Sequence, residues 1–477
     1  MRQAARIVLA LSCCLLMGGA SADELLTAVK AGDAASVQTL LADRADANDA
    51  DADGTTALHW AVHQNDLELA SALLGAGAAV DAPNRYGVRP LYLAAENGNA
   101  AIVSALLERG ADPNAALPEG ETALMTAART GDVATLETLL AAGADPNAKE
   151  GWRGQTALMW AAAANNAAAI ETLLAAGAER DAVSEGGEFT AFKFAVRQGA
   201  IEATQALLDA GADVDASLAD GTSALVLAVT NAHYELADLL LERGADPNAA
   251  GQGWTALHQI AWSRRWNMGF NSPGPVRTGD LDSLELVRRL VAYGADVDAR
   301  VTKEPIDGNR NKLNRVGATP FLLAAKSCDL PLMRTLLELG ADPSITTEDG
   351  TTALMAAAGV GIWAPGENPG THEEALAAVT LAFEVGGGAV DAVNANGETA
   401  LHGAVYRGGA IPVVEFLAER GAKLDAVNSL GWMPVTVADG VEYTPAVLKR
   451  YPEAAALLRR LMAEQGLPVP PSTQPGR

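Results

Sequence analysis

Residues 54–59 read Gly-Thr-Thr-Ala-Leu-His, and the return of this short stretch along the chain decides the fold. Its third residue, usually Thr, falls at positions 56, 89, 122, 156, 190, 223, 255, 319, 352, 399 and 433. Most neighbouring copies are 32 to 34 residues apart. A fixed period over most of a chain indicates stacked units, none of which can bury its apolar face alone.

The residue pattern of each unit predicts two helices followed by an extended hairpin. The Thr hydroxyl is suited to cap a first helix, and Ala follows five residues later in ten of eleven copies, where only a small side chain allows close packing. Paired leucines such as Leu73-Leu74 indicate a second helix that ends at the next Gly. A Gly-Ala-Asp-x-Asn/Asp pattern, as in residues 110–114, keeps the same period and predicts a turn-rich excursion.

These two patterns resemble the ankyrin repeat. Thr56-Ala57-Leu58-His59, Thr255-Ala256-Leu257-His258 and Thr399-Ala400-Leu401-His402 are similar to its Thr-Pro-Leu-His signature, and Gly110-Ala111-Asp112-Pro113-Asn114 is similar to the end of its unit. The resemblance covers about residues 23–464. It implies an all-α ankyrin-repeat solenoid of about twelve helix-turn-helix units with projecting hairpins, which binds partner proteins along its concave face. It also implies a structural role for His59, His258 and His402.

The domain organisation follows from this register. Residues 1–22 are expected to be a signal peptide and residues 23–54 an N-terminal capping repeat. The array is expected over 55–432, a C-terminal capping repeat over 433–464, and a proline-rich disordered tail over 465–477.

The N-terminus predicts export. Arg2 and Arg6 precede an apolar run over 7–17, and Ala20-Ser21-Ala22 is an A-x-A cleavage site. We expect cleavage after Ala22 and a periplasmic or secreted chain, which resembles exported bacterial ankyrin-repeat proteins. Lipid attachment through Cys13 or Cys14 is the alternative. No later apolar stretch approaches 18 residues, so no membrane insertion is expected after cleavage.

Charge and cysteine content exclude some function classes. The formal net charge is −25, which disfavours binding to nucleic acid. Cys328 is the only cysteine outside the signal, so the mature chain has no internal disulfide, and a monomer is expected.

Three insertions break the period. They lie near residues 263–280 and 359–372, each between the two helices of a unit, and near 300–316, in a hairpin. Insertions that avoid the stacked core map to loops, which carry function more often than core residues do. The two helix–helix insertions are expected to project from one edge of the stack and the long hairpin from the opposite edge.

The insertions are rich in the residue types that dominate binding sites. Residues 262–316 hold ten Lys or Arg and seven Asp or Glu, a net charge of +3 within an acidic chain. Aromatic residues and arginine are typical of protein-binding hot spots. The predicted partner-binding residues are Trp262, Arg264, Arg265, Trp266, Phe270, Arg300, Lys303, Arg310, Lys312, Arg315 and Trp363.

Two other interpretations of these residues stay open. Trp262, Trp266 and Trp363 could pack together only to anchor long loops, with the basic residues paired to acidic neighbours. Alternatively, the tryptophans could line a pocket for a sugar or another small molecule between the two helix–helix insertions.

The sequence offers no set of catalytic or cofactor-binding residues. It has no Gly-x-Ser-x-Gly, Cys-x-x-Cys or His-Glu-x-x-His motif. Residues 49–54 begin like a calcium loop, but the twelfth position is Trp60 instead of Glu. Asp329 is expected to raise the pKa of Cys328 and to keep its thiol unreactive. We therefore predict an exported, non-enzymatic scaffold that binds an unidentified protein partner without a cofactor.

Overall fold

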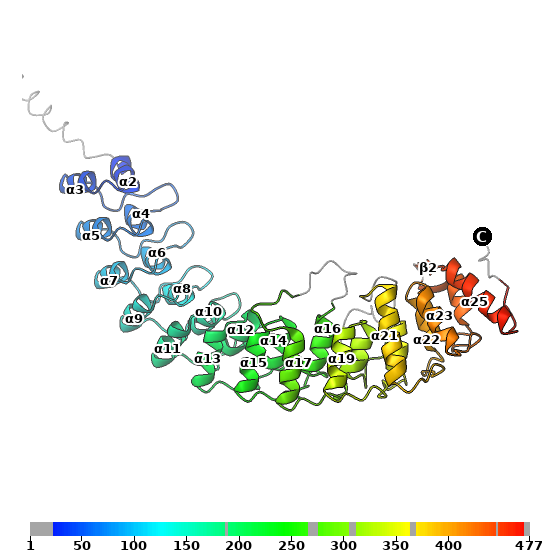
Figure 1. The fold of residues 1–477 in the computed structure, drawn as a ribbon. Coiled ribbons are helices and arrows are strands. Elements are labelled where there is room, and N and C mark those ends of the chain that lie inside the picture. Colours follow the sequence, from blue (N-terminus) through cyan, green and yellow to red (C-terminus); the bar gives the residue numbers. More distant parts are fainter. Residues whose placement is uncertain are drawn as a thin grey trace, which may run out of the picture. The chain divides into compact units, whose positions relative to one another are not determined.

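A computed structural model describes residues 22–186, 189–265, 275–304, 312–362, 369–444 and 447–471. Within these ranges the chain forms twelve successive pairs of antiparallel helices joined by extended hairpins (Figure 1). This confirms the predicted all-α repeat architecture. The pairs fall into two compact units, residues 1–213 and 214–477, which are described in turn.

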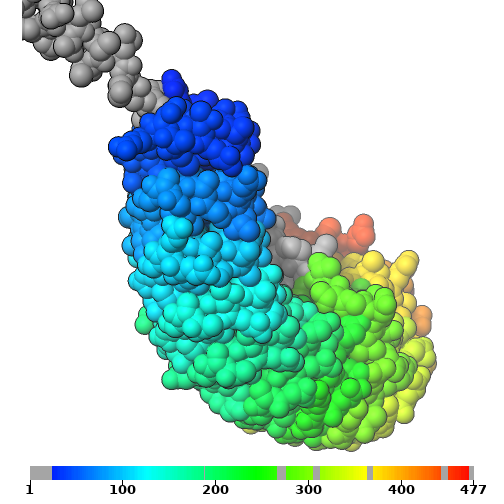
Figure 2. Space-filling model, turned by 90° about the vertical axis from the view of Figure 1, so that its left-hand side faces the viewer, coloured from blue at the N-terminus to red at the C-terminus, as the bar shows by residue number. Residues whose placement is uncertain are grey.

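Unit 1 holds six helix pairs. Figure 2 shows its successive repeats as adjoining bands from blue to green. The first helices are α2 (Ala22–Lys30), α4 (Ala57–His63), α6 (Pro90–Glu96), α8 (Ala123–Thr130), α10 (Ala157–Ala163) and α12 (Ala191–Gln198). The second helices are α3 (Ala34–Ala42), α5 (Leu67–Gly75), α7 (Ala100–Glu108), α9 (Val133–Ala141), α11 (Ala167–Ala175) and α13 (Ile201–Asp209).

Unit 2 also holds six pairs, and three of its second helices, α17, α21 and α25, are longer than nine residues. The first helices are α14 (Ala224–Thr230), α16 (Ala256–Ser263), α18 (Pro320–Lys326), α20 (Ala353–Ala358), α22 (Ala400–Tyr406) and α24 (Pro434–Gly440). The second helices are α15 (Tyr234–Glu242), α17 (Ser283–Ala292), α19 (Leu330–Glu338), α21 (His372–Val385), α23 (Ile411–Glu419) and α25 (Pro452–Glu464). The last pair is separated by antiparallel strands β1 (Val441–Thr444) and β2 (Val447–Lys449), which the sequence analysis did not predict.

The repeat motif sets where the first helices begin. Thr122 and Thr156 have extended backbones, and each hydroxyl accepts a hydrogen bond from the amide three residues on. In the His-containing copies the ring joins the cap, because the Thr56 amide donates to Nδ1 of His59 over 3.1 Å. The other ring nitrogen, Nε2, lies 3.0 Å from the Val88 carbonyl in the next hairpin. The predicted structural role of this histidine is confirmed.

Small residues and leucines form the core of each unit. Ala61, Ala94 and Ala127 follow the capping position by five residues and are fully buried, which allows neighbouring first helices to pack closely. Leu73 and Leu106 on the second helices are also fully buried. The alanine and leucine positions that define the period are therefore the positions that neighbouring repeats bury together.

The Gly-Ala-Asp-x-Asn pattern joins one repeat to the next. The Asn114 side chain accepts a hydrogen bond from the Asp145 amide over 2.8 Å and donates to the Gly143 carbonyl over 3.0 Å. Asp112 accepts from the Asn114 amide, which fixes the turn. In this copy the side chain at the end of the pattern therefore satisfies backbone groups of the following repeat.

Candidate functional site

The three insertions lie in unit 2, where the sequence places them between regular elements. The connection from α16 to α17 covers residues 264–282, and the connection from α20 to α21 covers 359–371. Four of the predicted partner-binding residues, Trp266, Phe270, Arg310 and Trp363, lie outside the described residues. The other seven can be placed.

Trp262 packs at the end of α16. Its ring meets that of Trp254 edge-on at a centroid distance of 5.3 Å, and the guanidinium carbon of Arg315 lies 5.8 Å from its centroid. Arg315 comes from the long hairpin, is almost fully buried and forms an ion pair with Glu304 at 2.7 Å. Trp262 therefore anchors the long hairpin to the end of α16.

Arg264 and Arg265 tie the end of α16 to the neighbouring repeats. Arg264 forms an ion pair with the buried carboxylate of Asp329 at 2.8 Å. Arg265 donates to the Cys328 carbonyl over 2.6 Å and pairs with Glu374 at 2.9 Å. Glu374 belongs to the first turn of α21, so Arg265 links the first helix–helix insertion to the end of the second.

The sequence analysis expected the long hairpin to project from the edge opposite the two helix–helix insertions. In the structure its described part contacts one of these insertions. The Lys312 amide donates to the Gly361 carbonyl over 3.0 Å, so the hairpin reaches the loop that follows α20. A Cβ added to Gly361 would lie 2.5 Å from Leu313, which shows how closely the two segments approach. The prediction was wrong because it used the position of the loop in the repeat and not its length, which lets it fold back. The described ends of the three insertions therefore contact one another.

The remaining basic residues of the long hairpin also contact this chain. Arg300 donates to the carbonyls of Gly317 and Thr346 over 3.0 and 2.8 Å, and Lys303 donates to the Gly251 carbonyl over 2.7 Å. The described basic groups at 264, 265, 300, 303 and 315 thus support neighbouring loops. Their role in contacting a partner stays a prediction.

A hollow of about 440 Å³ lies between the two helix–helix insertions, but its described lining is charged. Among the described residues it is lined by Arg264, Arg265, Cys328, Asp329, Leu330, Pro331, Glu374 and Ala377, with no tryptophan. The Trp-lined pocket of the small-ligand interpretation has no support in this part of the chain.

Cys328 borders the hollow and is almost fully buried. Burial raises the pKa of its thiol, while the nearby Arg407 and Arg265 act in the opposite direction. The direction agrees with the sequence analysis but the cause differs, because the Asp329 carboxylate is bound to Arg264. An uncharged thiol of this kind is a poor nucleophile.

Unit 1 carries exposed aromatic residues that the sequence analysis missed. Tyr86 and Trp152 occupy hairpin tips and are 59% and 76% exposed. Each is stacked by its neighbour in sequence, with the guanidinium carbon of Arg85 4.9 Å from the Tyr86 ring and that of Arg153 4.5 Å from the Trp152 ring. Stacked arginine holds a large aromatic side chain at the surface in a defined orientation.

Three half-buried aromatic residues also lie on the first helices of unit 1. Trp60, Tyr92 and Trp160 lie on α4, α6 and α10. Tyr92 donates to the Glu121 carboxylate of the following hairpin over 2.9 Å. We call these three residues, together with Tyr86 and Trp152, the aromatic surface of unit 1. A signal was available in the sequence, since Trp60 and Trp160 both follow a capping Thr by four residues.

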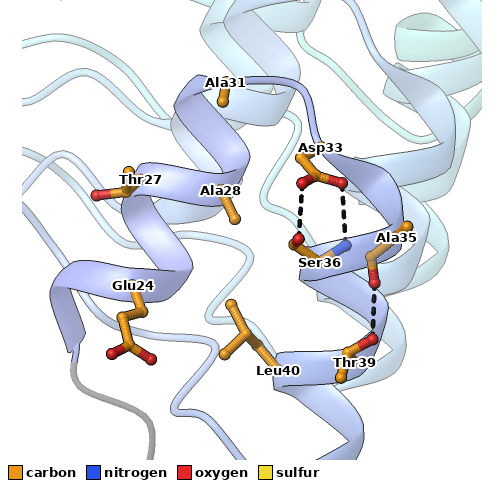
Figure 3. Close-up of a pocket in the computed structure, with 9 residues that line it drawn as sticks. All are labelled: Glu24, Thr27, Ala28, Ala31, Asp33, Ala35, Ser36, Thr39 and Leu40. Carbon is orange, nitrogen blue, oxygen red and sulfur yellow. Dashed lines mark hydrogen bonds between the residues drawn. The ribbon is translucent and has the colours of Figure 1, made fainter.

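A second hollow, of about 710 Å³, opens between α2 and α3 at the start of the described chain (Figure 3). It is lined by Glu24, Thr27, Ala28, Ala31, Asp33, Ala35, Ser36, Thr39 and Leu40. Asp33 accepts hydrogen bonds from the Ser36 amide and hydroxyl. Leu40 is half-buried, whereas Leu73, its counterpart one repeat later, is fully buried. The hollow is the face that a preceding repeat covers elsewhere in unit 1.

The described residues contain no cluster of His, Cys, Asp or Glu that could hold a metal ion. In the stretch that begins like a calcium loop, Asp51 binds Lys30 and Trp60, and Asp53 accepts from the Thr55 amide. Both carboxylates therefore accept hydrogen bonds from other groups of this chain.

Stacked helix pairs with hairpins joined by Asp and Asn side chains define a repeat protein whose exposed faces serve binding. The chain belongs to the ankyrin-repeat family. A family model described as "Ankyrin repeats (3 copies)" matches residues 25–116, 115–183, 162–251 and 192–269, and one described as "Ankyrin repeat" matches 396–429.

Two relatives illustrate the similarity. The chain is 27% identical over 223 residues to the phosphocholine transferase AnkX of Legionella pneumophila, which covers 44% of this chain and 20% of that protein. The chain therefore spans about a fifth of the length of this curated relative. The crystal structure of the human ASB11 ankyrin repeat domain is 29% identical and covers 47% of this chain and 98% of that domain, with a TM-score of 0.42.

The family sets the general function. Ankyrin repeats mediate protein–protein interaction and are typically binding modules without catalytic groups of their own. Among the described residues, no helix has both the length and the apolar character needed to span a bilayer.

Proposed function

We propose that the chain is an exported, non-enzymatic scaffold that binds a protein partner through the aromatic surface of unit 1 and the inserted loops of unit 2. Export rests on the sequence over residues 1–22, which lies almost wholly outside the described residues. The proposal that the chain is non-enzymatic rests on the family, whose repeats are typically binding modules.

The aromatic surface carries the proposal. An exposed Trp or Tyr contributes large contact area at a low cost in side-chain entropy, and residues of these types dominate measured binding energies. Trp152 leaves 76% of its surface exposed at a hairpin tip, although a purely structural role would favour burial. Arginine stacking fixes the orientation of the ring before a partner arrives, which reduces the cost of binding.

Site-specific photo-cross-linking in the periplasm tests the proposal. A photoreactive aromatic amino acid, which keeps a large ring at the hairpin tip, replaces Trp152 in one version and Glu171, exposed on α11, in a matched control. The proposal expects one defined protein to be linked from position 152 and not from position 171. Equal labelling from both positions, or none from position 152, would contradict binding through the aromatic surface.

A second comparison separates the two surfaces. The Trp266→Ala/Trp363→Ala variant alters the inserted loops, and Tyr86→Ala/Trp152→Ala alters the aromatic surface. Loss of the cross-linked or co-purified partner in both variants, with unchanged circular dichroism, supports joint use of the surfaces. Retention in the loop variant assigns the insertions to loop anchoring alone.

Export has its own test. When the full chain is produced in a Gram-negative bacterium, we expect it in the periplasmic fraction with Asp23 as its first residue, as measured by intact mass. A mass that includes a diacylglycerol group and disappears in Cys13→Ser or Cys14→Ser would establish the lipoprotein alternative. An uncleaved chain in the cytoplasm would refute export.

A further inference from the structure

Two tryptophans of unit 1 stand in the same local setting. Trp60 on α4 and Trp160 on α10 each follow their capping Thr by four residues. Each lies beside a basic residue from the preceding first helix, Lys30 from α2 and Arg129 from α8. These helices are neighbours in the row of first helices (Figure 1).

At Trp60 the two donors share one carboxylate of this chain. The indole Nε1 donates to Asp51 over 2.8 Å, and the Lys30 ammonium donates to the other oxygen of Asp51 over 2.7 Å. The ammonium also lies 5.0 Å from the centre of the Trp60 ring. These hydrogen bonds from Lys30 and Trp60 lower the pKa of Asp51, so the carboxylate stays charged.

At Trp160 the two equivalent donors, Nε1 and Arg129, meet no carboxylate among the described residues. Nε1 of Trp160 is shielded from water and has no hydrogen-bond partner in the described part of the chain. Arg129 is exposed, and its guanidinium carbon lies 5.9 Å from the ring centre. Over the described ranges, no acceptor binds this guanidinium. A buried donor without an acceptor costs stability, so it calls for an explanation.

The length of the hairpin accounts for the missing carboxylate. Asp51 and Glu150 are counterparts, because the Asp51 amide donates to Thr55 and the Glu150 amide donates to Gln155. The second loop is one residue longer. The Glu150 side chain points into this loop. Its carboxylate accepts hydrogen bonds from the backbone amides of Trp152, Arg153 and Gln155 over 2.6, 2.9 and 2.9 Å. Its carboxylate is therefore occupied away from Trp160.

We propose that a carboxylate side chain of the partner protein takes the place at Trp160 that Asp51 takes at Trp60. It would accept a hydrogen bond from Nε1 once the side chains that cover this atom shift on binding, and it would pair with the exposed Arg129. The inference rests on the proposed function and deepens it, because it makes the partner segment acidic. The net charge of −25 repels a carboxylate of the partner at most other places on this chain. One position that accepts a carboxylate would therefore fix the register of the partner segment.

Nuclear magnetic resonance of the indole groups provides the test. The mature chain is labelled with ¹⁵N-tryptophan, and the signals of Trp60 and Trp160 are assigned with Trp60→Phe and Trp160→Phe. The probe is an acetylated and amidated peptide of alternating Ser and Glu. A Ser–Gln peptide of equal length is the control. The Glu peptide is expected to move the Trp160 Nε1–H signal and to leave Trp60 unchanged.

Two variants sharpen the test. Arg129→Gln is expected to weaken the response of Trp160 by about tenfold or more, since it removes a charge-assisted hydrogen bond. Asp51→Ala removes the internal carboxylate and leaves no acceptor in its place, so it is expected to make Trp60 respond as Trp160 does. No shift at Trp160, or equal shifts with the Gln peptide, would overturn the inference. Cross-linking from position 152 would still test the proposed function, because it does not depend on the chemistry at Trp160.

Discussion

Asp329 shows how one side chain can hold several elements of the inserted region. It is 1% exposed, accepts from the Leu332 amide to cap α19, and forms an ion pair with Arg264. Arg264 in turn hydrogen-bonds to Ser283, the first residue of α17. A buried acid with two such partners contributes far more than an ordinary cap, because its loss leaves a guanidinium unpaired.

The loss of stability on replacement of Asp329 can therefore be predicted. Asp329→Ala is expected to lower the free energy of unfolding by about 3–5 kcal/mol. Asp132→Ala, which removes a cap on α9 without an ion pair, is expected to cost about 1 kcal/mol. Urea denaturation of both variants measures the two values. Equal losses would mean that the Arg264 pair contributes nothing beyond the cap.

The histidine of the repeat motif predicts a pH dependence. Burial lowers the pKa of His258 to about 4, below its usual 6.5. Between these values the unfolded chain binds the proton and the folded chain does not, so stability falls as the pH drops. From pH 7.5 to 5 the loss is about 2 kcal/mol. The stability difference between the parent and His258→Gln should narrow by that amount at pH 5. An unchanged difference would refute the prediction.

The sequence correctly predicted the roles of residues whose hydrogen-bond partners lie nearby in the chain. The Thr caps and the bonds of His59 follow from the motif itself, because their partners lie within the same repeat or the next hairpin. The sequence analysis made no prediction at Trp160, where the outcome depends on the direction of the Glu150 side chain. The 34-residue step from Thr122 to Thr156 recorded the longer loop. Only the structure shows that the extra residue draws the carboxylate away.

At the scale of elements, the insertions were located from spacing, but their arrangement was not. Spacing gives the number of added residues, whereas packing depends on close contacts such as that between Gly361 and Leu313. The β1–β2 hairpin was missed for a related reason, since it interrupts a terminal repeat where the periodic pattern no longer constrains the chain. Regular elements follow the period, and departures from it need contacts that the period does not encode.

The contact at Gly361 can be tested with a matched glycine. Gly361 and Gly110 both have positive φ, 84° and 87°, but an added Cβ meets Leu313 at the first and nothing within 4 Å at the second. Gly110→Ala is expected to cost about 1–2 kcal/mol from backbone strain alone. Gly361→Ala should cost clearly more, because the loop and the long hairpin must separate. Similar losses in urea denaturation would show that the close approach is not needed for stability.

At the scale of the whole molecule, the net charge affects the stability of the fold. The chain carries −25, and most of its described ion pairs lie at the surface, where a single pair contributes little. Repulsion among the remaining carboxylates therefore opposes folding. Added salt screens it, since the Debye length falls from about 30 Å at 0.01 M to about 8 Å at 0.15 M.

We therefore expect the thermal midpoint to rise by several degrees when NaCl increases from about 0.01 to about 0.15 M. Choline chloride at equal ionic strength should give the same rise, because screening does not depend on the identity of the cation. Differential scanning calorimetry measures both. A fall with salt would mean that the surface ion pairs outweigh the repulsion. A rise with NaCl alone would mean that sodium binds at particular carboxylates instead of screening them all.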